Sequence, residues 1–320
     1  MADYKKDLID RYWNYQVTQN SLRSNYLDGF HEAPKSPPVF KRSEAWRNVL
    51  VDPKAKSIEK NRLLALIPDG ERHKWFGSMN SSQALAQSVL GNLAIHDQLE
   101  FLSDLKSYEG HPLFGEADLS PQKFSMEHKI DFLGEPHKQT SLDAHFSGDY
   151  QIAIECKFTE PEVGTCSRPK LPITASNYKN EYCNGSYSVQ KPRKNRCSLT
   201  EIDVLYWQYV PSQFNWSNNC DYLLCPLYKN YQLVRNILAV SAYEDGIVSQ
   251  NKGHVILIYD ARNPAFQENG AGFKAYQNTR VALHSPEMLR KFSWQRIIEH
   301  VRHHNLLPWL TDELSLKYGF

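Results

Sequence analysis

The stretch 141–160 restricts the fold of this chain more than any other, because its pattern predicts a β-hairpin. Two runs rich in apolar residues, 142–146 and 150–158, flank the small polar turn Ser147-Gly148-Asp149. Polar residues alternate with apolar ones along the second run, which is typical of a strand with two different faces. We therefore build the analysis on this hairpin.

The length of the turn predicts the register of the two strands. A three-residue loop would pair Phe146 with Tyr150 and Ala144 with Ile152. A slip by one residue would send Asp143 into the apolar layer, so burial favours this register.

In that register three charged side chains share one face. Because side chains alternate along a strand, we expect Asp143, Glu155 and Lys157 to project together. The opposite, dry face should hold the apolar residues Leu142, Ala144, Phe146, Ile152, Ile154, Cys156 and Phe158.

Two carboxylates and an ammonium group on one face suit phosphodiester chemistry. Mg²⁺ is commonly held by one or two carboxylates together with water and phosphate oxygens. Such a metal polarises the phosphodiester and lowers the pKa of a bound water, while Lys157 positions that water or neutralises charge on the phosphate. The alternative is a surface hairpin with an ordinary Glu/Lys pair.

Asp143 followed by Glu155-Cys156-Lys157 in an apolar strand resembles the PD-(D/E)XK nuclease motif. The surrounding sequence resembles bacterial restriction endonucleases, which also have a helix beginning Ser-Ser-Gln, as at 81–93 here. The short motif covers about twenty residues, whereas the wider resemblance runs roughly from Ser78 to the C-terminus. Leu142 stands where the superfamily motif often has proline.

The resemblance implies roles for these residues and a substrate. Asp143, Glu155 and the backbone carbonyl of Cys156 would hold Mg²⁺, with Mn²⁺ able to substitute, and Lys157 would position the attacking water. It also implies double-stranded DNA as substrate. A cognate DNA methyltransferase and a homodimer stay open alternatives: palindromic cutting would imply a two-fold dimer, but no coiled-coil seam in the sequence points to one.

A second Glu-x-Lys sequence, Glu127-His128-Lys129, is rejected as the catalytic pair. Its buried face would hold His128, and Pro121 interrupts the segment before it. The resemblance leaves two roles open for Glu127, a further metal ligand or a residue behind the ligands, against a plain surface glutamate. Gln83 lies on a predicted helix, either reaching toward the site or solvated. Gln232 resembles a position where PD-(D/E)XK proteins place a polar residue near the metal or phosphate.

Composition excludes a strong global attraction to nucleic acid. The formal net charge is +1, so contacts with DNA must come from local patches. Residues 161–198 are irregular and basic, and they form either a DNA-backbone contact or a solvated loop. The candidate DNA-binding residues are Arg168, Lys170, Lys191, Arg193, Lys194 and Arg196.

The sequence also predicts the compartment. No apolar run reaches the roughly 18 residues of a membrane span, and the N-terminus has no apolar signal region, so we expect a cytoplasmic protein with no membrane contact. Six cysteines without a secretion signal do not indicate disulfides. Two hypotheses remain for them: reduced thiols, or a structural zinc or iron–sulfur site on Cys166, Cys183, Cys197 and Cys220.

The order of predicted elements is that of an α/β fold. Hydrophobic residues make up 41% of the chain, enough for a large core. We expect a helical region at 80–105, strands at 123–133 and 254–259 around the hairpin, helices at 199–214 and 228–243, and a final helix at 286–304. The order matches a restriction-endonuclease-like core, a mixed sheet flanked by helices, over 78–320, with a helical N-terminal extension over 1–77.

We therefore expect a metal-dependent DNA endonuclease, of the type II restriction kind, acting in bacterial defence. One alternative is a sequence-independent repair or defence nuclease, since the motif serves both and sequence readout lies in variable loops. Another is an inactive nuclease fold that only binds DNA or a partner protein.

Overall fold

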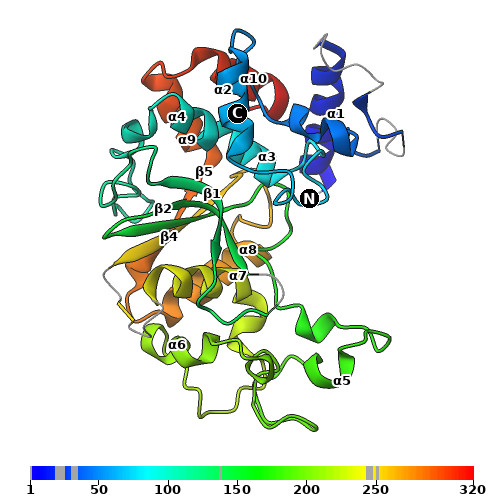
Figure 1. Ribbon diagram of the computed structural model, residues 1–320, viewed down its shortest axis with the longest axis vertical. Helices are drawn as coiled ribbons and strands as arrows, with labels where there is room; N and C mark the ends of the chain where they lie inside the picture. Colours follow the sequence, from blue (N-terminus) through cyan, green and yellow to red (C-terminus); the bar gives the residue numbers. More distant parts are fainter. Residues whose placement is uncertain (1, 19–25, 30–34, 137–138, 243–247, 250–251) are drawn as a thin grey trace.

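A five-stranded mixed sheet lies at the centre of the protein, with helices on both faces (Figure 1). This computed structural model describes residues 2–18, 26–29, 35–136, 139–242, 248–249 and 252–320. The strands follow one another in sequence order across the sheet: β1 (Phe124–Ile130), β2 (Thr140–Phe146), β3 (Gln151–Cys156), β4 (Gly253–Tyr259) and β5 (Leu289–Ser293). The predicted α/β class and the restriction-endonuclease-like core are confirmed.

The sheet combines an antiparallel half with a parallel half. The β1–β2 and β2–β3 pairs are antiparallel, whereas β3–β4 and β4–β5 are parallel. Parallel neighbours need long crossovers, and helices supply them here. All seven residues of β4 are buried, which explains its uninterrupted apolar run and confirms the predicted strand at 254–259.

The helices form two layers around the sheet. One face is covered by α1 (Ala2–Thr18), α3 (Ser82–Ala86), α4 (Asn92–Ile95), α9 (Trp294–His303) and α10 (Pro308–Tyr318), with α2 (Ser57–Ala65) packed on α4. The other is covered by α6 (Tyr206–Gln213), α7 (Pro226–Ser241) and α8 (Ala271–Ala282). The short helix α5 (Tyr178–Glu181) projects beyond this second layer (Figure 1).

Short 3₁₀ and π-helical segments complete the architecture. Five are 3₁₀ turns in the described residues: η2 (Arg42–Asn48), η4 (Leu99–Leu102), η5 (Arg168–Lys170), η6 (Thr200–Ile202) and η7 (Pro286–Met288). A π-helical turn, η3 (Gln87–Gly91), lies between α3 and α4.

The predicted helix at 80–105 is therefore divided. Ser81 caps its start as expected, because its hydroxyl accepts a hydrogen bond from the Ala84 amide at 3.1 Å. Gly91 allows α2 to approach closely: a β-carbon there would lie 2.9 Å from Leu63 Cδ1. A glycine that weakens the helix locally thus permits close helix packing.

The prediction of one helix over 286–304 is wrong. The segment contains η7, the edge strand β5 and only then α9. Ser293 separates strand from helix, since its hydroxyl accepts a hydrogen bond from the Arg296 amide at 3.4 Å. The apolar spacing of Leu289 and Phe292 fits both elements over so short a run, and pairing of β5 with β4 decides for the strand.

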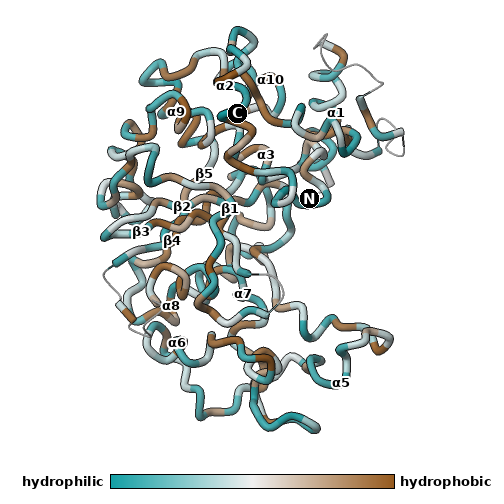
Figure 2. The backbone as a smooth tube through the Cα atoms, in the orientation of Figure 1, coloured by the Kyte–Doolittle hydropathy of each residue, from teal (hydrophilic) through white to brown (hydrophobic). Residues whose placement is uncertain are grey.

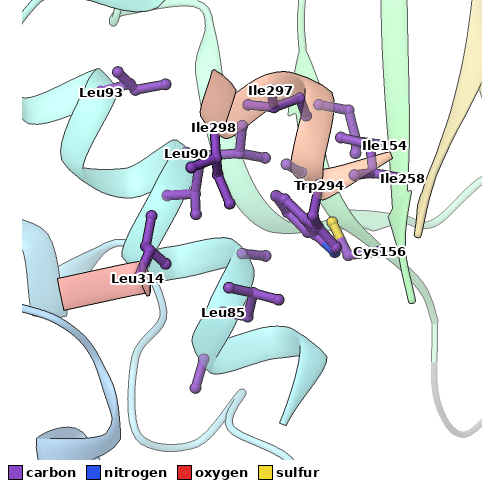
Figure 3. Packing of buried hydrophobic residues seen from close by; sticks show 14 of the residues in the cluster. Leu85, Leu90, Leu93, Ile154, Cys156, Ile258, Trp294, Ile297, Ile298 and Leu314 are labelled. Atoms are coloured by element: carbon purple, nitrogen blue, oxygen red, sulfur yellow. The ribbon is translucent and has the colours of Figure 1, made fainter. Parts of the chain in front are cut away.

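Two hydrophobic clusters, one on each face, hold the layers together. In the first, Trp294 lies beside Cys156 of β3, with Leu85 and Leu90 of the α3–η3 segment nearby (Figure 3). Hydrophobic segments accordingly concentrate in the strands at the centre of the molecule (Figure 2). Leu8 of α1 belongs to the same cluster, so the N-terminal segment packs on the core. The domain boundary at 77 stays a prediction.

A buried lysine joins α10 to the η2 turn and makes stability depend on pH. Lys317 Nζ donates hydrogen bonds to the backbone and side-chain oxygens of Asn48, at 2.6 and 2.8 Å. Burial lowers the pKa of Lys317 to about 7. The pKa of a lysine in an unfolded chain is about 10.5. Between pH 7 and this value, Lys317 binds a proton in the unfolded state more than in the folded state, so its contribution to the free energy of unfolding rises with pH.

We expect the free energy of unfolding of the wild type, compared with Lys317→Met, to increase from pH 7 to pH 10. Taking the difference between the two proteins cancels the contribution of the other titrating groups. Urea unfolding of both proteins at each pH measures this difference in the free energy of unfolding. Parallel pH profiles for the two proteins would contradict the lowered pKa.

Candidate active site

The hairpin has a different register from the one predicted. Phe146 pairs with Ile152 and Ala144 with Ile154, two residues further along β3 than expected. The reason is a longer connection, because residues 147–150 lie outside both strands. A shift of two residues keeps every β3 side chain on its predicted face, and continuing the ladder sets Asp143 opposite Glu155.

At Glu127 the alternation of side chains in β1 and β2 is reversed. Its φ is 50°, the left-handed region, and it lies between the pairs Met126–Ala144 and His128–Leu142. Met126 and Ala144 pack in the first hydrophobic cluster, but Leu142 packs in the second. The prediction that Leu142 shares a face with Ala144 is therefore wrong, because the strands change sides at this point.

This reversal sets three carboxylates in one row across the sheet. Glu127 in β1, Asp143 in β2 and Glu155 in β3 stand at successive positions of the two ladders. Asp143 is held by a hydrogen bond that its Oδ2 accepts from the Cys156 amide at 2.6 Å. Burial, followed by the charges of Glu155 and Glu127, raises the pKa of Asp143 well above its usual value.

Glu155 is fully buried, because α7 covers the face of the sheet that holds the charged side chains. Its Oε1 lies 2.7 Å from Lys157 Nζ, and its Oε2 accepts a hydrogen bond from Asn236 Nδ2 of α7 at 2.7 Å. The Lys157 contact is an ion pair, and Oε1 receives no well-aligned hydrogen bond from the described residues. One lone pair of this carboxylate is thus available to a cation.

Lys157 is an ammonium ion in this surrounding. Burial alone would lower the pKa of Lys157, but the charges of Glu155, Glu160 and Asp143 outweigh burial and hold it above its usual value. Its Nζ also donates to Gln232 Oε1 of α7 at 3.0 Å. A charged lysine with fixed partners can position water or neutralise phosphate charge, but it cannot accept a proton.

Both glutamines singled out from the sequence touch this group. Gln232 contacts Lys157, and Gln83 of α3 donates from Nε2 to Glu127 Oε1 at 2.5 Å. Ser141 donates to the other oxygen of Glu127 at 2.6 Å. The structure therefore assembles Gln83, Glu127, Asp143, Glu155, Lys157 and Gln232, and their functional roles stay predictions.

Three further contacts with the site were not identified from the sequence. Asn236 lies one helical turn after Gln232, a spacing that would have found it. Glu160 lies close enough to affect Lys157 and accepts a hydrogen bond from Ser82 at 2.6 Å. Gly164, with φ of 108°, would place a β-carbon 2.3 Å from Gln232 Oε1, so only glycine leaves Gln232 its position.

Most candidate DNA-binding side chains have partners within the protein. Arg168 forms an ion pair with Glu181, Lys170 with Glu162 at 3.7 Å, and Arg196 with Asp221 at 2.6 Å, while Arg193 is buried and donates to the Tyr182 carbonyl. Lys170, Lys191 and Lys194 are exposed. These three lysines are the members of the set best placed to meet a phosphate.

The row of acids has the chemistry of a divalent-metal site. Three carboxylates face a single ammonium group, so this cluster of four side chains has fewer positive than negative charges. Carboxylate oxygens are also the hard ligands that Mg²⁺ prefers. Among the described residues, no group of three or more His, Cys, Asp or Glu side chains is arranged so that it could hold a metal ion without other ligands. Two carboxylates with water and phosphate oxygens would suffice for Mg²⁺.

A restriction-endonuclease-like sheet with an acid row and a lysine at its hairpin defines a nuclease-like class of protein. The family model for "Restriction Endonuclease associating with ARP" matches residues 14–319, so the chain belongs to this family. No curated protein and no solved structure matches the chain. Among the described residues, no helix is long and apolar enough to cross a membrane.

The repulsion among the three acids of the row can be tested by its effect on thermal stability. In Asp143→Asn, the amide oxygen keeps the hydrogen bond from Cys156, while repulsion by Glu127 and Glu155 disappears. Without metal we expect Tm at pH 7 to rise by on the order of 2 °C or more. Because the folded-state pKa is raised, the wild type gains stability as pH falls, so the difference should shrink toward pH 5.

Excess Mg²⁺ should raise the Tm of the wild type but not that of Asp143→Asn. Asp149→Asn, in the exposed turn of the same hairpin, is the matched control and should behave as wild type. Equal Mg²⁺ shifts in all three proteins would exclude Asp143 as a ligand.

Proposed function

We propose that the protein is a metal-dependent endodeoxyribonuclease that hydrolyses phosphodiester bonds of double-stranded DNA, with the acid row as its active site. The observation that supports it most is Lys157, a buried ammonium group paired with Glu155 beside Asp143. A protein that only binds DNA has no need for three crowded acids, which cost stability. Membership of a restriction endonuclease family supports the same class of reaction.

In this proposal Asp143, Glu155 and the carbonyl of Cys156 hold Mg²⁺, or Mn²⁺ in its place, with Glu127 as a further ligand or a residue that orients the ligands. When bound, the metal supplies a polarised phosphodiester and an activated water. Asn236 fixes one oxygen of Glu155, so the carboxylate keeps its orientation during reaction. Lys157, held by Gln232, positions the water and stabilises negative charge on the phosphate.

We further propose that the enzyme is of the type II restriction kind and acts in defence as a homodimer beside a cognate methyltransferase. Sequence-independent cleavage is the second candidate, since the described site explains hydrolysis but has no feature that reads bases. The basic segment 161–198 would contact the DNA backbone through its exposed lysines.

The test is cleavage of supercoiled plasmid and phage DNA with Mg²⁺, Mn²⁺ or EDTA. We expect cleavage that needs metal and falls at least about 100-fold in Glu155→Gln and in Lys157→Met, two changes that keep side-chain shape. Lys129→Ala, in the rejected Glu-x-Lys sequence, should retain activity, because Lys129 is exposed and pairs with Glu71.

Discrete fragments would indicate restriction, and a smear would indicate sequence-independent cleavage. Metal-independent cleavage, or equal activity in Glu155→Gln and wild type, would exclude the acid row as the active site. DNA binding without cleavage by folded wild type would leave only the binding function.

A further inference from the structure

Four cysteine side chains converge in the segment between β3 and α7, and the set differs from the one expected. Each pair among Cys166, Cys183, Cys197 and Cys225 is close enough for its sulfur atoms to interact electrostatically. Cys220 is exposed and outside this set. Cys225, at the N-terminus of α7, therefore takes the place that the sequence analysis gave to Cys220.

Backbone hydrogen bonds bring these cysteines together from distant points of the chain. The Cys166 amide donates to the Tyr228 carbonyl at 2.9 Å, and the Cys225 amide donates to the Gly185 carbonyl at 2.8 Å. Tyr187 pairs in both directions with Tyr222 at 2.8 Å, and its ring lies near both Cys197 and Cys225. The convergence is thus a property of the folded backbone, which spans about sixty residues here.

One of the four sulfur atoms accepts a backbone hydrogen bond, since the Gly185 amide donates to Cys183 Sγ at 3.3 Å. The amides of Arg168, Leu199 and Leu227, each two residues after a cysteine, lie near enough to act electrostatically on Cys166, Cys197 and Cys225. A neutral thiol is a weak acceptor, whereas a thiolate is a strong one. Backbone amides next to all four sulfur atoms form a surrounding that favours thiolates.

The segment around the thiols contains little regular secondary structure. Between β3 and α6 the described elements are only η5, α5 and η6, of three or four residues each. Loop-rich regions that bury little apolar surface are commonly stabilised by metals or disulfides. The cysteines are all free in this structure, and buried thiols have a raised pKa, as Cys166 does at about 11.

We propose that Cys166, Cys183, Cys197 and Cys225 form a structural tetrathiolate metal centre, which binds Zn²⁺ or an iron–sulfur cluster. Tetrahedral sulfur ligands are specific for these two kinds of centre. Zinc needs sulfur atoms about 2.3 Å from the ion, and the thiols are not at ligand spacing as they lie here. Binding therefore draws the four side chains together and releases their protons.

The centre would connect the basic segment to the acid row. Cys166 lies two residues after Gly164, which contacts Gln232, and Cys225 begins the helix that presents Gln232 and Asn236. Gln232 and Asn236 in turn hold Lys157 and Glu155. The metal would thus fix α7 and the loop before it in one arrangement, and its loss would loosen both.

The experiment is metal analysis of the purified full-length protein, prepared without added chelator, for zinc, iron and acid-labile sulfide. We expect one zinc ion or one iron–sulfur cluster per chain in the wild type. Cys225→Ser and Cys197→Ser should each lose most of it, whereas Cys220→Ser, five residues from Cys225, should retain it. Iron with sulfide and visible absorption identifies a cluster, and zinc alone identifies the mononuclear ion.

Addition of Co²⁺ to metal-free protein gives a second readout, a thiolate-to-cobalt charge-transfer band expected in wild type and Cys220→Ser but not in Cys225→Ser. This readout is independent of DNA cleavage, so the centre and the nuclease function can fail separately. Protein that contains no metal and gives no cobalt band would overturn the proposal, as would equal loss in Cys220→Ser and Cys225→Ser.

Discussion

The buried ion pair between Glu155 and Lys157 is the interaction on which the rest of the site depends. Burying either charge alone would cost several kcal/mol, roughly, so each side chain requires the other. Asn236 of α7 donates to the other carboxylate oxygen of Glu155, and Gln232 of α7 accepts a hydrogen bond from Lys157. Helix α7 must therefore pack against the end of β3 that holds the pair. This packing, together with the apolar residues of β4, places the layer of helices on this face of the sheet.

Much of this arrangement could be predicted from the sequence because it depends on local periodicity. Alternation along 150–158 correctly gives the two faces of β3, and the apolar run 254–259 correctly gives a central strand. The hairpin register was wrong by two residues, because the length of a connection is set by its backbone conformation rather than by its composition. The error left the β3 faces unchanged, which is why the site residues nonetheless come together.

Other features depended on contacts between distant segments. Nothing in a sequence shows that Glu127 takes a left-handed conformation, so the opposite placement of Leu142 and Ala144 was not predictable. The burial of Glu155 beneath Asn236 could not be predicted without knowing where α7 packs on the sheet. Likewise, the sequence does not distinguish Cys220 from Cys225. The fold does, because the Cys225 amide pairs with the Gly185 carbonyl whereas Cys220 is exposed.

The left-handed conformation of Glu127 also bears on how the molecule avoids self-association. β1 forms one border of the sheet, and borders with unpaired amide and carbonyl groups invite other chains to add a strand. The reversal at Glu127 interrupts the flat row of such groups halfway along β1, so a foreign strand in regular extended geometry matches only half of it. The same left-handed residue that lies in the acid row thus also makes the edge strand β1 a poorer template for an added strand.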